Sequence, residues 1–239
     1  MLLEKVREKM INKKIYILAF MLFTSNTGAF VYSQNSTSIV PEAIYQIETL
    51  LNKPAMIYPA IVTALGRNWF RMETDFHVFT DQASFEQVAS VMLDLDNLET
   101  IYNGKKSKMT VSIVNQTKNE ALIDFVSISI GPLGIQFKTP YRANVKNTVN
   151  TSTKVVVELR QPQSDSSSNN DIKNLYSTQY AEEVMINGKK YIYIRVYTIN
   201  DANAFILPGA KHLFEREAEP AGIEGMNMIV NAAKNRSSF

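Results

Sequence analysis

The order of secondary-structure patterns constrains this chain more than any single motif does. A segment with helical spacing of apolar residues, 84–103, is followed by six segments of period-two alternation between Ser107 and Asn200. The chain then closes on a second helical segment, 209–235. A sheet of sequential antiparallel strands has one apolar face to bury, and the final helix is available to cover it. We therefore predict an α+β fold in which the sheet wraps around the last helix and encloses an apolar cavity.

The N-terminus has the layout of a secretory signal peptide. Basic residues between Lys5 and Lys14 precede an apolar run at 15–23, and small and polar residues follow as far as Ser33. The run is shorter than the roughly 20 residues that span a bilayer, which disfavours the alternative of a membrane anchor. We expect residues 1–33 to be removed and the mature protein to be exported, periplasmic or secreted, with no membrane span after cleavage.

Charge and cysteine content exclude several kinds of partner. Five of the 25 basic and two of the 23 acidic residues lie in 1–33, which leaves 20 basic against 21 acidic residues. This balance provides no electrostatic drive toward nucleic acid. The chain has no cysteine, so it has neither disulfides nor thiolate metal sites. We expect no metal and no cofactor.

The remaining chain divides into an extension and one domain. Residues 34–66 form an N-terminal extension with a short helix at Pro41–Asn52, expected to pack outside the main fold, and 67–239 form the domain. The first strand of the domain, Trp69–Phe79, has one apolar and one polar face. The helix after it begins at a cap such as Ser84 and is split in two near residues 94–97.

The last part of the domain carries two clear boundary signals. Asn187-Gly188, between strands 175–186 and 190–200, is the strongest short hairpin signal. Pro220 is expected to kink or restart the final helix because proline removes a backbone donor.

These elements resemble the START-like (SRPBCC) superfamily, which includes plant pollen allergens, polyketide cyclases and steroidogenic lipid-transfer domains. The resemblance rests on element order, the split helix ending in Tyr102-Asn-Gly104, and the entry to the last helix through Leu207-Pro208 with Arg216 and Pro220 beyond. It implies a helix-grip fold, in which a curved antiparallel sheet grips the long C-terminal helix. It also implies a cavity between them for a lipid or other hydrophobic small molecule.

Four candidate ligand-binding residues belong to the expected inward faces. They are Phe125, Phe137, Tyr141 and Met226. Plain core packing is the alternative for each, since aromatic and methionine stripes are more often core. Ser127 and Ser129 follow Phe125, and a bulge there would turn polar side chains into the cavity, although an ordinary change of face near the strand end has the same appearance.

Three further candidates are polar. Arg195, flanked by Tyr193 and Tyr197, could anchor a carboxylate or phosphate head group, with Tyr180 on the neighbouring strand. The alternative is that this tyrosine face is a solvated surface of cross-strand pairs. The two histidines, His77 and His212, have no metal-ligand spacing and are predicted at the surface.

The leading hypothesis is an exported, monomeric START-like domain that binds or carries a hydrophobic molecule. Apolar burial would supply the affinity and a few polar groups would select the head group. A cyclase- or hydrolase-type enzyme on the same scaffold is the second hypothesis; its candidate residues are Asp124, Tyr180, Glu182 and Arg195. We rank it lower because the inward faces are short of acids and histidines. The third hypothesis is a non-enzymatic envelope protein that contacts another protein.

Overall fold

The structure is a computed structural model that describes residues 43–44, 46–66, 69–105, 107–130, 136–162, 172–203 and 210–236. Side chains are described in these ranges except at 129–130, 136–139, 202–203 and 210–217. The predicted signal peptide, 1–33, and His212 with its surface prediction therefore lie outside the described part.

Strands dominate the described chain. The helical elements are α3 (Ile47–Leu50), α4 (Phe85–Met92), the 3-10 turn η1 (Leu95–Asn97), α5 (Leu98–Ile101) and α6 (Ala210–Lys234). The strands are β1 (Ala55–Met56), β2 (Ile61–Gly66), β3 (Trp69–Thr80), β4 (Ser107–Gln116), β5 (Glu120–Ile130), β6 (Gln136–Asn150), β7 (Lys154–Arg160), β8 (Ile172–Ile186) and β9 (Lys189–Asn203). The six strands predicted between Ser107 and Asn200 are thereby confirmed.

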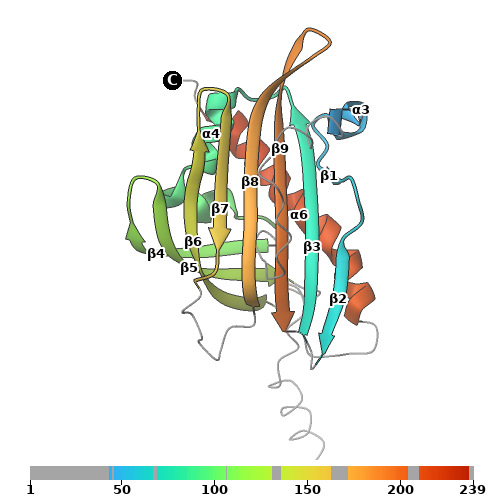
Figure 1. The fold of residues 1–239 in the computed structure, drawn as a ribbon, viewed down its shortest axis with the longest axis vertical. Helices are drawn as coiled ribbons and strands as arrows, with labels where there is room; N and C mark the ends of the chain where they lie inside the picture. Colours follow the sequence, from blue (N-terminus) through green and yellow to red (C-terminus); the bar gives the residue numbers. More distant parts are fainter. Residues whose placement is uncertain are drawn as a thin grey trace, which may run out of the picture.

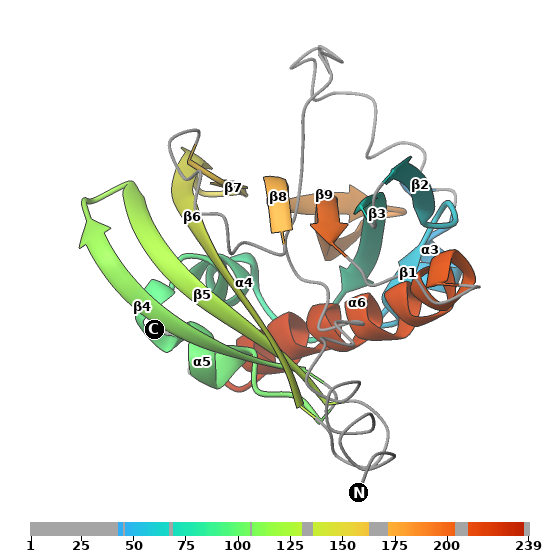
Figure 2. The same ribbon diagram turned by 90° about the horizontal axis from the view of Figure 1, so that it is seen from below.

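All nine strands belong to one antiparallel sheet. Its order is β1-β3-β9-β8-β7-β6-β5-β4, and β2 pairs with β3 beyond the end of β1 (Figure 1). Seen from below, the strands form an arc over α6 (Figure 2). This arrangement confirms the predicted α+β helix-grip architecture.

The pairing of β3 with β9 brings the first long strand beside the last one and fixes the two faces of the sheet. Phe76 pairs with Val196 and Val78 pairs with Ile194, so these side chains lie on the same face. They share a core with Met226 of α6. We call this the inner face and the opposite one the outer face.

The inner face is covered by α4 and α6. Phe85, Val88 and Met92 of α4 and Met226, Ile229 and Val230 of α6 are buried in one core with side chains of β3 to β9. Helix α6 lies close against β3 at Gly222, where a β-carbon would lie 2.0 Å from Cζ of the Phe76 ring. Only glycine permits this contact, so it holds α6 directly against the sheet.

Local signals read from the sequence position the helices as expected. The Ser84 side chain accepts a hydrogen bond from the Gln87 amide, and the Gln87 side chain accepts one from the Ser84 amide, which is a capping box. The Asp94 carboxylate caps η1 and splits the helical segment in two. Asn187 and Gly188 both have positive φ, 51° and 76°, as the predicted hairpin turn requires.

Two details differ from the sequence predictions. Pro220 lies inside α6, and the helix continues through it rather than restarting. The helix predicted at Pro41–Asn52 is interrupted, since Ala43 and Ile44 are helical, Gln46 lies in a turn, and α3 covers Ile47–Leu50.

The N-terminal extension packs on the outer face of the sheet. Ala43 and Leu50 are fully buried against Phe79 and Tyr193. The extension also adds β1 and β2 to the sheet edge. Within the described ranges, no helix has both the length and the apolar character to cross a bilayer.

Candidate functional site

Three of the predicted ligand-binding residues belong to the buried core at the inner face. The rings of Phe125 in β5 and Tyr141 in β6 are stacked, with centroids 5.1 Å apart and planes 14° apart. Met226 of α6 belongs to the same buried core. The side chain of Phe137 lies outside the described part. The described aromatic wall is thus formed by Phe125 and Tyr141, with α6 below it.

The hydroxyl groups near this wall are held in their neutral form. Tyr102, at the end of α5, is buried, and its hydroxyl accepts a hydrogen bond of 3.3 Å from Nε2 of Gln179 in β8. Burial raises the pKa of Tyr102, an effect that the Gln179 hydrogen bond opposes. Burial, together with the nearby Tyr102, raises the pKa of Tyr141. Both phenols therefore offer polar contacts without charge.

A strip of small polar side chains crosses β3, β9 and β8 on the inner face. Thr74 pairs with Thr198, and Thr198 pairs with Ser177, so three hydroxyl residues lie side by side across three strands. The Ser177 hydroxyl donates to the Tyr197 carbonyl at 3.0 Å and lies 3.1 Å from the Thr198 hydroxyl. We define the polar strip as Thr74, Ser177, Gln179, Thr198 and Asn200, all of which are buried.

Asn200 differs from the rest of the polar strip. Its side chain is 0% exposed, yet neither Nδ2 nor Oδ1 has a hydrogen-bond partner among the described residues. It pairs with Met72 of β3, opposite an irregularity in β8 between Lys173 and Tyr176. Leaving a buried polar group unsatisfied costs about 1–3 kcal/mol. An amide that leaves both a donor and an acceptor unused therefore requires an explanation.

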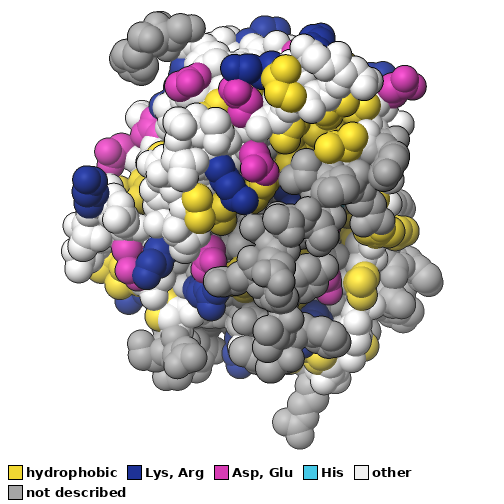
Figure 3. Space-filling model, turned by 45° about the horizontal axis from the view of Figure 1, so that its top comes forward, with side chains coloured by type: hydrophobic (Ala, Val, Ile, Leu, Met, Phe, Trp, Pro, Cys, Tyr) yellow, Lys and Arg dark blue, Asp and Glu magenta, His cyan; other side chains and the backbone are white. Residues whose placement is uncertain are grey.

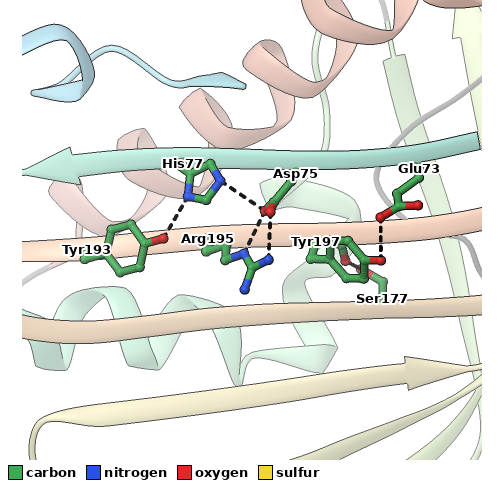
Figure 4. Close-up of polar contacts among 7 residues, drawn as sticks. All are labelled: Glu73, Asp75, His77, Ser177, Tyr193, Arg195 and Tyr197. Atoms are coloured by element: carbon green, nitrogen blue, oxygen red, sulfur yellow. Dashed lines mark hydrogen bonds and ion pairs between the residues drawn. The ribbon is translucent and has the colours of Figure 1, made fainter. Parts of the chain in front are cut away.

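The outer face of the same strands carries a hydrogen-bonded and ion-paired group, the outer network (Figure 4). The Tyr193 hydroxyl lies 2.7 Å from Nδ1 of His77, and Nε2 of His77 lies 3.2 Å from Oδ1 of Asp75. Arg195 donates two hydrogen bonds of 2.7 Å to the Asp75 carboxylate. Tyr197 lies beside Arg195 and donates to Glu73 at 2.8 Å. The outer network is Glu73, Asp75, His77, Tyr193, Arg195 and Tyr197.

These contacts set the charge of the outer network. Burial opposes the ionisation of Asp75, but the contacts with His77 and Arg195 outweigh it and hold the pKa of Asp75 below its usual value. The Arg195 guanidinium places two of its donors on a carboxylate of its own sheet, 16% of its side chain being exposed. The outer network is therefore suited to joining β3 to β9.

This geometry corrects the prediction for His77 and places three predicted ligand-binding residues on the outer face. His77 is buried at 2% exposure rather than lying at the surface, because the extension and Tyr193 cover that end of the outer face. Tyr193 and Arg195 alternate with the inner-face residues of β9, and Tyr180 packs edge-on against Tyr193 at 5.9 Å. Tyr180, Tyr193 and Arg195 therefore do not share a site with Phe125, Tyr141 and Met226.

The proposed bulge at Ser127 and Ser129 is absent from the pairing of β5 with β6. Phe125 pairs with Tyr141 and Ser127 pairs with Thr139, with no shift between them. Ser127 therefore follows Phe125 on the inner face by simple alternation.

The polar strip was missed by sequence reasoning, although a signal existed. Ile192, Ile194 and Val196 alternate as apolar residues, and Thr198 and Asn200 then continue the same face. The change from apolar to polar along one face marks the strip. What a single strand cannot reveal is that Ser177 and Thr74, from strands distant in sequence, meet it.

Charge at the surface is mixed. Basic and acidic side chains lie interspersed with hydrophobic ones on the face in Figure 3. Several form exposed pairs, such as Arg142 with Asp124 and Lys190 with Glu183. Among the described residues, no group of three or more His, Asp or Glu side chains gathers as metal ligands would.

Comparison with known proteins identifies the fold. No family model matches the sequence, and no curated protein matches it. Among solved structures, human StAR-related lipid transfer protein 5 superposes with a TM-score of 0.52 at 8% identity, covering 80% of this chain and 93% of that one. The fold is START-like. A STAR-related lipid transfer protein from Xanthomonas axonopodis gives a TM-score of 0.48 at 7% identity, with 74% and 100% covered.

At sequence identities this low, the comparison establishes the START-like fold and no finer relationship. The subfamily is unresolved, and the residues that line the inner face of this chain have to be interpreted from their own geometry.

Proposed function

We propose that this START-like domain binds and carries a hydrophobic small molecule, of lipid type, between the inner face of the sheet and α6. The observation that carries the proposal is the composition of the inner face. An aromatic wall and aliphatic side chains lie at one end, and a buried polar strip with an unpartnered amide lies at the other. Ligand sites are typically apolar with a few oriented polar groups.

Two further observations support a binding role. Ser127 is only half-buried although it lies on the inner face next to buried Phe125, which is what a ligand entrance at this end of β5 would require. A solved structure of the same fold is named a lipid transfer protein. The described inner face contributes no buried histidine or acid, which favours carriage over catalysis.

The test uses an uncharged fluorescent probe, N-phenyl-1-naphthylamine, and mass spectrometry of extracts from unpurified protein. We expect probe binding and a co-extracted apolar molecule. Adjacent residues of β5 supply a matched pair, because Ser127 and Val126 are both half-buried but face opposite sides. Ser127→Trp should weaken probe binding by at least about tenfold, which is about 1.4 kcal/mol, whereas Val126→Trp should not.

The contrary result is also specific. Absence of both probe binding and any extracted ligand would overturn the proposal, provided that circular dichroism confirms a folded protein. Equal effects of the two tryptophan variants would place the binding surface elsewhere.

We further propose that residues 1–33 act as an export signal, so that the carrier works outside the cytoplasm. Its support is the order of basic, apolar and small-residue segments. N-terminal sequencing of the protein recovered from its native cells tests this. A mature N-terminus near Gln34 is expected, and an intact N-terminus on protein inside the cytoplasm would contradict it.

A further inference from the structure

The side chain of Asn200 limits the kind of molecule that the inner face could hold. The carboxamide of Asn200 presents a hydrogen-bond donor, Nδ2, and an acceptor, Oδ1, bonded to the same carbon. Neither atom is paired among the described residues, and the side chain is fully buried. A ligand group that pairs with both atoms must donate one hydrogen bond and accept another. A hydroxyl or a primary amide has this property.

The hydroxyl groups of Ser177 and Thr198 do not pair with the Asn200 amide. Ser177 donates its proton to the Tyr197 carbonyl, so in its contact with Thr198 it can only accept. The Thr198 proton is thus directed to Ser177. Within the described strip, two of the hydroxyls therefore satisfy each other, and the amide of Asn200 is the group that remains to be paired.

Among the described residues, the surroundings of the strip offer no charge to an ionised head group. The buried polar residues described on the inner face are all uncharged. Asp201 follows Asn200 directly, but it lies on the outer face, where it pairs with Arg71 at 2.7 Å and accepts from Asn174 at 2.7 Å. A carboxylate or phosphate beside Asn200 would find no compensating charge among the described residues, and burial of an unpaired ion is strongly unfavourable.

We propose that Asn200 is the head-group contact of this carrier and that its ligands are uncharged amphiphiles, an apolar chain or ring system ending in a hydroxyl or a primary amide. The inference rests on the proposed binding function. In this complex Nδ2 donates to the ligand oxygen and Oδ1 accepts from the ligand hydroxyl or amide proton. The aromatic wall of Phe125 and Tyr141 and the aliphatic residues of the inner face contact the apolar part.

The test compares three ligands of equal chain length: decanol, decanamide and decanoate. Each displaces N-phenyl-1-naphthylamine from the full chain at a pH where decanoate is ionised. We expect decanol and decanamide to compete at least about tenfold more strongly than decanoate, since a site built for hydrogen bonds to a neutral group rejects one that leaves them unmade. Equal or stronger competition by decanoate would overturn the inference.

The variant Asn200→Leu keeps the approximate volume and removes both polar atoms. It should reduce the affinities of decanol and decanamide by about tenfold or more, while binding of the probe, which lacks these groups, is retained. Asn200→Ser, which keeps one hydroxyl, should give an intermediate loss and serves if the leucine variant does not fold. Unchanged alcohol and amide affinities in both variants would overturn the inference.

Asn147 provides the matched control. Its Oδ1 is also buried without a partner among the described residues, but Asn147 lies in β6, three strands from Asn200, and Val157 of β7 separates it from Gln179 of the polar strip. Asn147→Leu should leave all three affinities unchanged, and a loss there instead of at Asn200 would overturn the assignment. The two proposals fail in different ways: absence of all binding, probe included, removes the carrier function, whereas probe binding without head-group selectivity removes only the role of Asn200.

Discussion

The two faces of strands β3, β9 and β8 bury polar side chains in opposite ways. On the outer face, Arg195 donates two hydrogen bonds to Asp75, so the two ions neutralise each other, and Nδ1 of His77 pairs with the Tyr193 hydroxyl, although Nε2 of His77 only lies near Asp75 without a hydrogen bond. On the inner face, Asn200 is fully buried, and neither of its amide atoms has a hydrogen-bond partner in the part of the chain that the structure describes. Buried groups that satisfy each other stabilise the fold, whereas buried groups without partners are a cost that a bound ligand can remove. The outer face therefore holds the strands together, and the inner face is the one on which we propose that a ligand is recognised.

The largest expected effect comes from breaking the outer network at its centre. Asp75→Ala leaves Arg195 without its carboxylate in a place where only 16% of the arginine side chain is exposed. Removing one partner of a buried pair costs about 3 kcal/mol, which urea unfolding measures. Asp124→Ala is the matched control, because Asp124 accepts the same two bonds from Arg142 but both side chains are about two-fifths exposed. A loss of only about 0.5 kcal/mol is expected there.

The same carboxylate makes the stability of the protein depend on pH. The pKa of Asp75 lies below its unfolded value, so its contribution is complete above about pH 4 and is lost as the pH falls through the folded pKa. Below about pH 4 the stability of the native chain should therefore fall more steeply than that of Asp75→Ala. Urea midpoints across this range measure the difference. Parallel curves would show that the outer network does not hold Asp75 ionised.

A clash at Gly222 should alter the inner face while leaving the outer network intact. In Gly222→Ala, the new methyl group meets the buried ring of Phe76 at 2.0 Å. A clash this short belongs at the upper end of the roughly 1–3 kcal/mol that overpacking costs, and alanine gains ~1 kcal/mol in helix propensity, so a net loss of about 2 kcal/mol is expected. Gly104→Ala is the control, because its methyl group would meet the ends of two side chains, Cε of Met228 at 2.1 Å and Cδ of Glu224 at 2.9 Å, rather than a buried ring. A smaller loss for Gly222 than for Gly104 would contradict the close contact of α6 with β3.

These residues show which features of the structure the sequence can predict. Alternation in β3 and β9 predicts which side chains share a face, because the period of a strand is local, and the capping box at Ser84 is equally local. The sequence alone could not predict that His77 is buried, since its burial depends on Tyr193 and on the N-terminal extension. Nor could it identify Asn200, because a missing hydrogen bond becomes visible only when every neighbour is in place.

Tyr193→Phe makes a smaller change in the outer network. It removes the hydroxyl 2.7 Å from Nδ1 of His77 and leaves that buried nitrogen without this partner. A loss of about 1–2 kcal/mol is expected from chemical denaturation. Tyr197→Phe, whose hydroxyl contacts the half-exposed Glu73, should cost less. Equal losses would mean that burial does not distinguish the two hydroxyls.

The smallest effect is expected on the inner face. Asn200→Leu exchanges an unpaired amide for an apolar group of similar size, so the free energy of unfolding without ligand should change by less than about 1 kcal/mol or increase. Thermal and urea unfolding of ligand-free protein measure it. A loss above about 2 kcal/mol would mean that the amide is satisfied in the folded chain, and the contrast between the faces would disappear.

The contact between the N-terminal extension and the outer face determines when the fold can be completed. Leu50 packs with Tyr193, and β3 pairs with β9, although most of the chain separates the members of each pair. Contacts this distant in sequence are slow to form because a long loop must close first. Strands β1 and β2 can pair with β3 early, and β4 to β8 can assemble as successive hairpins. The pairing of β3 with β9 and the packing of Leu50 on Tyr193 form only when β9 has been made. The last long strand of the chain thus closes the sheet around its first one.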